Sequence, residues 1–236
     1  MSDLPINDGQ DKIWSYFQDQ GIELFLGAQA RLAYILKEIR KRNLHSVLNI
    51  GVGGGTFEQI AREEGLKVSS IDPDSAAIEQ LGKRLEIDAR VGYAQDIPFE
   101  DAQFDAVVVS EVLEHLEYET MLQVFTEVKR VLVPGGYFIG TVPYQEKLLN
   151  GMAICPYCGR KFHRWGHLQS FSTDKMCNFL TSYFDVEHIF PRLFITFSTL
   201  NWKGEIIASV KWILWKLGLS ESKTNLVFIA RRGKVS

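Results

Sequence analysis

The chain has 236 residues, 46% of them hydrophobic, and carries a net charge of −3 at pH 7. This size and composition predict one large folded domain, or one with a modest insertion, and the charge balance shows none of the basic footprint expected of a nucleic-acid-binding protein. No apolar run approaches the roughly 18 residues of a membrane span, and the polar start lacks a secretory signal, so we expect a soluble cytoplasmic protein with no nucleic-acid partner.

An N-terminal helical cap is predicted over residues 1–45. Apolar side chains between Ile13 and Phe25 suggest one amphipathic segment. A second segment, 28–42, has its apolar residues at helical spacing and ends in a basic cluster, which suits the helix dipole.

From residue 46 onward, short apolar strands alternate with amphipathic helices. Strands are predicted at 47–50, 67–71, 89–91, 104–109 and 137–142, and helices at 56–64, 74–85 and 118–132. After Pro143 the alternation stops, and a further helix at 173–183 and strands at 184–190 and 225–230 follow. Strands that alternate with helices predict a doubly wound α/β fold, with a parallel sheet covered on both faces.

A glycine-rich turn follows the first predicted strand at Gly51, Gly53, Gly54 and Gly55. Glycine permits a sharp turn from strand to helix and lets a ligand approach the backbone closely. The turn lacks the Gly-Lys-Ser/Thr ending of a P-loop and the final glycine of a dinucleotide loop. Phosphate and NAD chemistry are therefore disfavoured, and residues further along must identify the ligand.

Two acidic residues follow the next strands. Asp72 ends the second predicted strand, where a doubly wound sheet offers an acid to the ribose of a ligand. Either Asp72 or Asp74 also suits the N-cap of the following helix, and the two could divide these roles. Asp96, after the third strand, can bond an adenine amino group while Ile97 packs on the ring, although an ordinary surface turn would show the same residues.

The order of these motifs resembles the class I S-adenosylmethionine-dependent methyltransferases, particularly small-molecule methyltransferases of the ubiquinone-biosynthesis type. The resemblance covers about residues 28–143 and includes S-E-V-L-E-H-L at 110–116 and L-V-P-G-G-Y-F-I-G-T-V-P at 132–143. It implies a Rossmann-like, mostly parallel sheet of seven strands, with the last strand antiparallel and a Cys/His-containing insertion after strand five. Residues 46–236 are then the methyltransferase domain, with the insertion at 144–170 and a long connection at 191–222.

The resemblance also implies a set of cofactor-binding residues: Asn49, Gly51, Gly53, Gly55, Asp72, Pro73, Asp96, Ile97, Ser110 and Glu111. The glycines pass under the methionine end of S-adenosylmethionine, and Asp72 binds its ribose. Ser110 and Glu111 line the path to the methyl group. Asn49 stands where the family usually has an acid, a departure that weakens or reroutes a hydrogen bond to the amino group of the cofactor.

His115 is the candidate catalytic residue. The sulfonium of S-adenosylmethionine is already a strong electrophile, so the protein mainly aligns a nucleophile with the methyl carbon. A base is needed when the acceptor is a hydroxyl, and a neutral histidine after the fourth strand suits that role. The alternative is that His115 caps or packs on the helix that follows. We expect O-directed transfer to a small-molecule, glycan or lipid-linked acceptor; the alternative is a non-catalytic cofactor-binding or zinc-stabilised interaction protein of the same fold.

A cysteine–histidine cluster reads C-x2-C-x4-H-x3-H at Cys155, Cys158, His163 and His167. Four such ligands favour a closed tetrahedral zinc site with a structural role. The alternatives are a reduced C-x-x-C loop and a rival metal site. In the rival site, E-x-x-E-H at 111–115 resembles the metal-binding motif of small-RNA 2′-O-methyltransferases and quinone-pathway O-methyltransferases, completed by one of the two histidines.

The segment 202–217 is rich in tryptophan, aliphatic residues and lysine. It is too short and too charged to span a bilayer. It suits peripheral membrane contact or a lid over an apolar acceptor. The alternative is a helix packed on the sheet between the last two strands.

Overall fold

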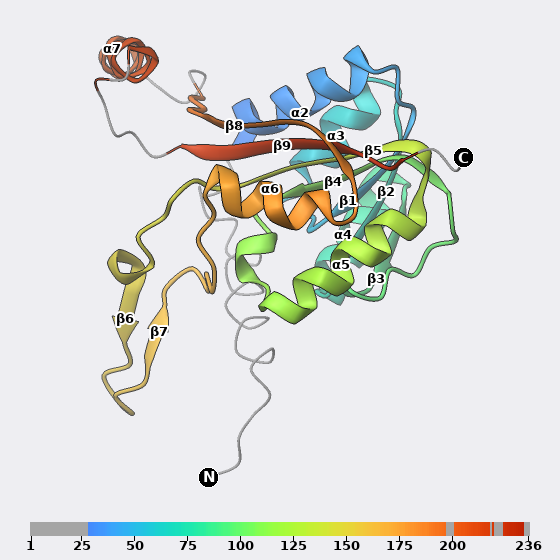
Figure 1. Cartoon of the computed structure of the whole chain (residues 1–236), viewed down its shortest axis with the longest axis horizontal. Coiled ribbons are helices and arrows are strands. Elements are labelled where there is room, and N and C mark those ends of the chain that lie inside the picture. The colour runs from blue at the N-terminus through green and yellow to red at the C-terminus, as the bar shows by residue number, and fades with distance from the viewer. Residues whose placement is uncertain (1–27, 197–200, 218, 220–223, 234–236) are drawn as a thin grey trace.

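The computed structural model describes residues 28–196, 201–217, 219 and 224–233 (Figure 1). The amphipathic segment predicted between Ile13 and Phe25 lies outside these residues. The main sheet has seven strands in the order β3-β2-β1-β4-β5-β9-β8. Their bounds are β1 Ser46–Ile50, β2 Lys67–Asp72, β3 Asp88–Val91, β4 Phe104–Ser110, β5 Leu132–Pro143, β8 Asp185–Arg192 and β9 Asn225–Arg231.

Strand direction confirms the predicted fold class. Strand β1 runs parallel to β2 and β4, β2 is parallel to β3, and β4 is parallel to β5. Strand β9 is antiparallel to both β5 and β8. The sheet is therefore Rossmann-like and mostly parallel with an antiparallel last strand, and its strand order reverses between β1 and β4, where such sheets bind ligands.

Helices cover the two faces of the sheet (Figure 1). They are α2 Gln29–Lys41, α3 Thr56–Glu63, α4 Ser75–Leu85, α5 Tyr118–Val131, α6 Thr173–Thr181 and α7 Trp202–Lys216, with short 3-10 helices η2 Leu113–His115 and η3 Leu148–Gly151. Helices α2 and α3 pack on one face and α5 and α6 on the other. Because successive strand side chains point to opposite faces, Val47 joins the first core while Leu48 joins the second.

The two acids after β2 have different roles. Asp74 is the N-cap of α4, and its carboxylate accepts hydrogen bonds from the N–H groups of Ala76 and Ala77. This bonding satisfies two of the backbone donors that a helix start leaves open. Asp72 is consequently available for another role at the end of its strand.

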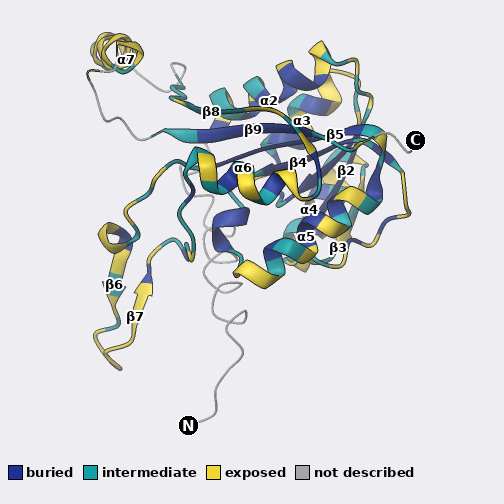
Figure 2. Ribbon diagram, in the orientation of Figure 1, coloured by how far each residue is buried: buried dark blue, intermediate teal, exposed yellow. Residues whose placement is uncertain are grey.

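Two features project from the body of the fold. A small hairpin, β6 Met152–Ile154 and β7 Lys161–His163, lies in the predicted insertion and extends away from the sheet (Figure 1). Helix α7 stands apart from the other helices, and nearly all of its residues are exposed (Figure 2). Within the described ranges, none of the helices is both long and apolar enough to cross a membrane.

Candidate functional site

A cavity of about 600 Å³ opens at the carboxyl ends of β1, β2 and β4. This is the point at which the strand order reverses, and it is where an open α/β sheet binds its ligand. Of the predicted cofactor-binding residues, the cavity wall includes Asn49, Gly51, Gly53, Asp72, Pro73, Ser110 and Glu111. The wall does not include Gly55, Asp96 or Ile97.

Gly51 shapes the turn beneath the cavity. Its φ of +84° lies in the left-handed region, and a Cβ built there would stand 2.8 Å from Cγ2 of Val112. Its N–H donates to the carbonyl of Ile71 at 2.9 Å, so the turn is fixed to the end of β2. A side chain would therefore both strain the backbone and clash with Val112, which also lies on the cavity wall.

Gly55 serves a different purpose from the one expected. Its φ is +72°, and a Cβ there would meet the side chains of Arg84 and Leu81 on α4. Gly55 is also the N-cap residue of α3. Gly55 thus permits close packing of α3 against α4 and lies off the cavity wall.

Asp72 joins the glycine turn to β2. Its carboxylate accepts the N–H of Val52 at 2.9 Å and the N–H of Asp74 at 2.9 Å. The residue is 6% exposed and lies on the cavity wall. Asp72 thus places a carboxylate, an acceptor of hydroxyl hydrogen bonds, at this wall of the cavity.

The two predicted adenine contacts, Asp96 and Ile97, lie off the cavity wall. Asp96 is exposed in a turn, and Ile97 is buried in the hydrophobic core with 2% exposure. Nearby, Gly92, the half-exposed Tyr93, Ala94 and Gln95 line the cavity. Sequence reasoning missed these residues because none of them is of a type that marks a ligand contact.

A buried carboxylate lies behind Asn49. The Asn49 amide donates to Oε1 of Glu58 at 2.7 Å and to the carbonyl of Gly51 at 3.1 Å. The Ser70 hydroxyl donates to the same carboxylate oxygen at 2.8 Å. Burial raises the pKa of Glu58. Asn49 therefore links the glycine turn to Glu58 on α3. Glu58 could not be predicted as a buried acid, because it lies in an amphipathic helix with other acids that are exposed.

Polar groups also meet at the end of β4. Nε of Arg31 donates to the Ser110 hydroxyl at 2.9 Å, and the amide of Asn225 donates to Glu111 at 2.9 Å. Glu111 has a φ of +58°, which is strained for a residue with a side chain. Such strain is common at functional sites. Arg31 was not predicted as a site residue, because it lies on α2, before the first of the sequence motifs.

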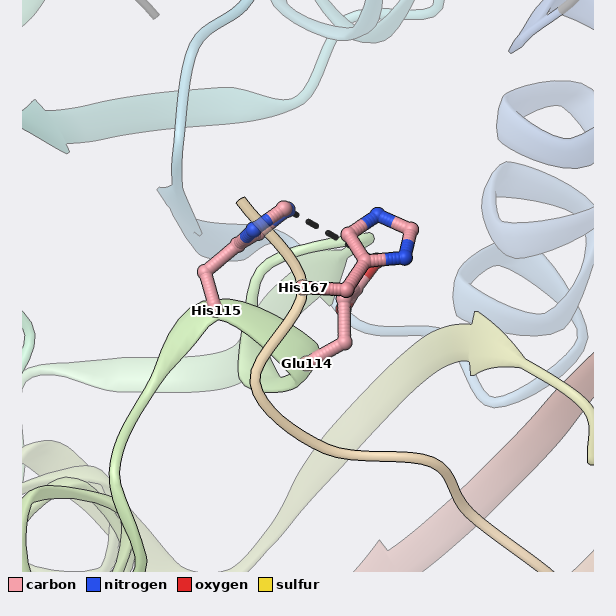
Figure 3. Close-up of side chains that lie close together, drawn as sticks. All are labelled: Glu114, His115 and His167. Atoms are coloured by element: carbon pink, nitrogen blue, oxygen red, sulfur yellow. Dashed lines mark ion pairs between the residues drawn. The ribbon is translucent and has the colours of Figure 1, made fainter. Parts of the chain in front are cut away.

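Glu114, His115 and His167 meet beside this end of the cavity (Figure 3). The first two lie on η2, while His167 belongs to the segment that follows β7. That segment is held in place because the N–H groups of Leu168 and Gln169 both donate to the carbonyl of Glu114, at 2.8 and 3.1 Å. The rings of His115 and His167 are 4.8 Å apart between centroids.

The local electrostatics favour the uncharged form of both η2 side chains. Burial, with a smaller contribution from His167, lowers the pKa of His115 to about 3. Burial and the adjacent Glu111 carboxylate raise the pKa of Glu114 well above its usual range. His115 is therefore a neutral imidazole, and Nδ1 contacts the carbonyl of Gly166 at 3.2 Å.

The two insertion histidines lie with glutamates rather than with the two cysteines. Cys155 and Cys158 stand at the tip of the hairpin, where backbone N–H groups of Cys158 and Tyr157 lower the pKa of Cys155. His163 pairs with Met152 at the end of the hairpin opposite to the cysteines. In the described part of the chain, the residue groups close enough to hold a metal are Glu114/His115/His167 and Glu146/His163/His167. The predicted four-ligand zinc site is thus not assembled in this arrangement.

The rival E-x-x-E-H site forms only in part. Glu114 and His115 join His167, but Glu111 belongs to neither metal-capable group among the described residues. Glu111 instead accepts from Asn225, and its second oxygen is 4.0 Å from Nε of Arg31. Glu146, which no motif identified, lies on the cavity wall beside His167.

Comparison with known proteins gives a family match over the centre of the chain. A family model described as a methyltransferase domain matches residues 48–140. The human mitochondrial ubiquinone biosynthesis O-methyltransferase is 38% identical over 109 residues, covering 41% of this chain and 28% of that protein. A fatty-acid O-methyltransferase of Mycolicibacterium smegmatis is 40% identical over 100 residues, covering 40% of this chain and 36% of that protein. This chain thus spans about a third of the length of these two relatives.

A solved structure extends the likeness to most of the fold. A SAM-dependent methyltransferase from Methanosarcina mazei superposes with a TM-score of 0.61 at 20% sequence identity. The match covers 80% of this chain and 93% of that one. At this identity the likeness shows a shared fold.

Proposed function

We propose that this chain, which belongs through residues 48–140 to the class I S-adenosylmethionine-dependent methyltransferase family, transfers a methyl group to a hydroxyl of a small-molecule, glycan or lipid-linked acceptor. The observation that carries the proposal is the cavity itself. Its wall has the glycine turn and Asp72 at one end, and His115 with His167 at the other. Two relatives that are named as O-methyltransferases support the O-directed part.

The cavity fits the cofactor at the glycine turn. Gly51 and Gly53 lie on the cavity wall, and glycine lets a ligand approach the backbone closely. Asp72 is proposed to accept the ribose hydroxyls, and Ser110 with Glu111 to border the methyl group. S-adenosylmethionine supplies a methyl group on an electrophilic sulfonium when it is bound.

The acceptor is proposed to enter beside His115. A carbonyl oxygen can only accept a hydrogen bond, so the contact with Gly166 places the proton of His115 on Nδ1. Nε2 then carries a lone pair. In the proposed reaction this nitrogen accepts the hydrogen bond of the acceptor hydroxyl and orients its oxygen toward the methyl carbon.

Calorimetry with S-adenosylmethionine tests the proposal. The wild-type chain should bind, and Asp72→Asn, which keeps an acceptor for the backbone N–H groups, should bind at least about 10-fold more weakly because it loses a charged acceptor. Asp88→Asn is the matched control, since Asp88 is partly exposed and pairs with Arg90. Absence of wild-type binding at millimolar cofactor would overturn the proposal. Binding without methylation of any acceptor would favour the non-catalytic alternative.

The proposed acceptor class includes lipid-linked molecules because of α7. Its exposed apolar residues Trp202, Ile206, Val210 and Ile213 recur along one side of the helix, and Ile207, Trp212 and Leu214 are exposed beside them. The helix also carries three lysines against one glutamate. An apolar face flanked by cations suits the surface of an anionic bilayer, and peripheral contact there would bring the protein to its acceptor.

A further inference from the structure

We propose that one zinc ion joins two copies of this chain, held by Cys155 and Cys158 at the hairpin tip of each copy. The four thiolates form a closed tetrahedral site that neither copy completes alone. The site is independent of methyl transfer, since neither cysteine lies on the cavity wall. It also differs from the zinc knuckle expected within one chain, which needed two histidines as further ligands.

The turn between β6 and β7 is shaped to present two thiolates. The N–H of Cys155 donates to the carbonyl of Arg160 at 2.9 Å, and the N–H of Gly159 donates to the carbonyl of Cys155 at 2.9 Å. Gly159 has a φ of +69°, which glycine adopts without strain. Backbone N–H groups of Cys158 and Tyr157 donate to the Cys155 sulfur and lower its pKa. They therefore favour the thiolate, which is the form that binds metal.

No other cysteine or histidine of this chain joins the pair at the tip. All three cysteines and all five histidines lie in the described residues. His163 is at the opposite end of the hairpin, where its Nδ1 accepts the N–H of His167 at 3.1 Å. Of the described groups close enough to hold a metal, neither includes a cysteine. Two thiolates are half of a structural zinc site, so the other two ligands must come from outside this copy.

The tip is accessible to a second copy. The hairpin extends away from the sheet (Figure 1), and every residue from 156 to 162 is exposed. Ile154 and Tyr157 lie beside the cysteines and are 61% and 97% exposed. A two-fold contact brings the same surface of each copy together. Two tips therefore supply four thiolates and cover apolar side chains of both copies.

The charge around the tip suits a zinc ion with four thiolates, because such a site has an excess of negative charge. From Lys147 to Arg164 the chain contains basic residues and no aspartate or glutamate. Arg160 and Lys161 follow the turn directly and are exposed, so each copy brings cations close to the thiolates. The same cations repel one another between two metal-free tips. The contact should consequently depend on zinc.

Light scattering and metal analysis on the full chain test the zinc bridge. The chain is first freed of metal with EDTA and kept in a phosphine reductant, which prevents disulfides. ZnCl₂ should then double its molar mass at about half an equivalent of zinc per chain, and EDTA should reverse the change. Cys158→Ser should not change its molar mass in ZnCl₂, because each tip then has a single thiolate. Cys177→Ser, on α6, is the matched control and should respond as the wild type does.

Three results would overturn the zinc bridge. The first is a wild-type chain that takes up no zinc. The second is uptake of a full equivalent per chain with no change in molar mass, which would restore the knuckle within one chain. The third is a doubling of molar mass that Cys158→Ser retains, which would place the contact elsewhere.

Two further measurements on Cys158→Ser complete the experiment. Thermal unfolding should match that of the metal-free wild type, since the substituted side chain is exposed at a hairpin tip. Calorimetry with S-adenosylmethionine should show the affinity of the wild type, because the tip lies off the cavity wall. A chain that dimerises with zinc but binds no cofactor would refute only the methyltransferase proposal.

Discussion

The glycine turn shows at the scale of single residues how backbone shape prepares a ligand site. Gly51 and Gly65 both have φ values near +80°, but only Gly51 has a side chain close to the position of an added Cβ. The two positions therefore separate backbone strain from the loss of space. They also provide a matched pair of substitutions.

Gly51→Ala should reduce S-adenosylmethionine affinity at least about 10-fold, because the new methyl group meets Val112 at 2.8 Å and displaces the turn. Gly65→Ala has nothing within 4 Å of its Cβ, so it bears only the left-handed strain of about 1–2 kcal/mol. Urea unfolding and calorimetry on both variants measure the two effects. Equal loss of affinity in the two would show that strain, rather than space at the turn, is responsible.

Glu58 gives a second residue-scale prediction, on pH. Burial raises its pKa above the usual glutamate value of 4.5. The folded chain therefore holds a proton that the unfolded chain releases, so stability is complete below about pH 4.5 and falls as the pH rises through the folded pKa. Glu58→Gln should remove this fall, because the glutamine does not titrate and still accepts from Asn49 and Ser70.

Urea midpoints at pH 5 and pH 8 measure the Glu58 effect. The drop between the two pH values should be smaller in Glu58→Gln than in the wild type. Glu63→Gln is the control, since Glu63 is exposed on the same helix. An identical drop in wild type and Glu58→Gln would contradict the prediction.

Residue types at strand ends explain which site residues could be predicted. Gly51, Asp72 and Ser110 lie where parallel strands end, and the sheet brings those positions together whatever the loops do. Asp96 and Ile97 lie off the cavity wall because the side that a turn residue faces depends on packing, here of Ile97 into the core. Arg31 reaches Ser110 from 79 residues away, a contact that no local pattern contains.

At the scale of elements, hydrophobic periodicity predicted the positions of strands and helices, but it did not always predict the residues at which they begin and end. Strand β5 was expected to begin at residue 137 but begins at Leu132, because Pro134 and the glycines lie within an irregular stretch of the strand. The segment that forms the hairpin β6–β7 was expected to fold around a zinc ion. Its strands pair instead, which separates the cysteines at the tip from His163 at the base.

Helix α7 carries the element-scale prediction. Ile206→Glu should reduce binding to anionic phospholipid vesicles by about 10-fold or more, because burial of an isoleucine side chain contributes about 1.5–3 kcal/mol. Gln59→Glu, exposed on α3, makes the same change in charge elsewhere. Co-sedimentation with vesicles measures both variants. Equal binding of Ile206→Glu and wild type would rule out this face of α7 as the contact.

At the scale of the whole molecule, one edge of the sheet gathers the proposed chemistry. The carboxyl ends of β1, β2 and β4 hold the cofactor side, and η2 with the segment after β7 holds the acceptor side. The position of the cofactor side could be predicted, because it follows from the order of the strands. The acceptor side depends on the insertion, whose path is set by hydrogen bonds to the carbonyl of Glu114. The spacing of residues in the sequence does not predict these hydrogen bonds.

The antiparallel last strand has a consequence for synthesis of the protein. Asn225, the first residue of β9, pairs with Pro143 and donates to Glu111 from 114 residues away. A ribosome makes the glycine turn, Asp72 and η2 long before it makes this strand. A nascent chain that stops short of residue 225 thus has the predicted cofactor-binding residues and still lacks the amide that holds Glu111, so this wall of the site is completed only once β9 has been made.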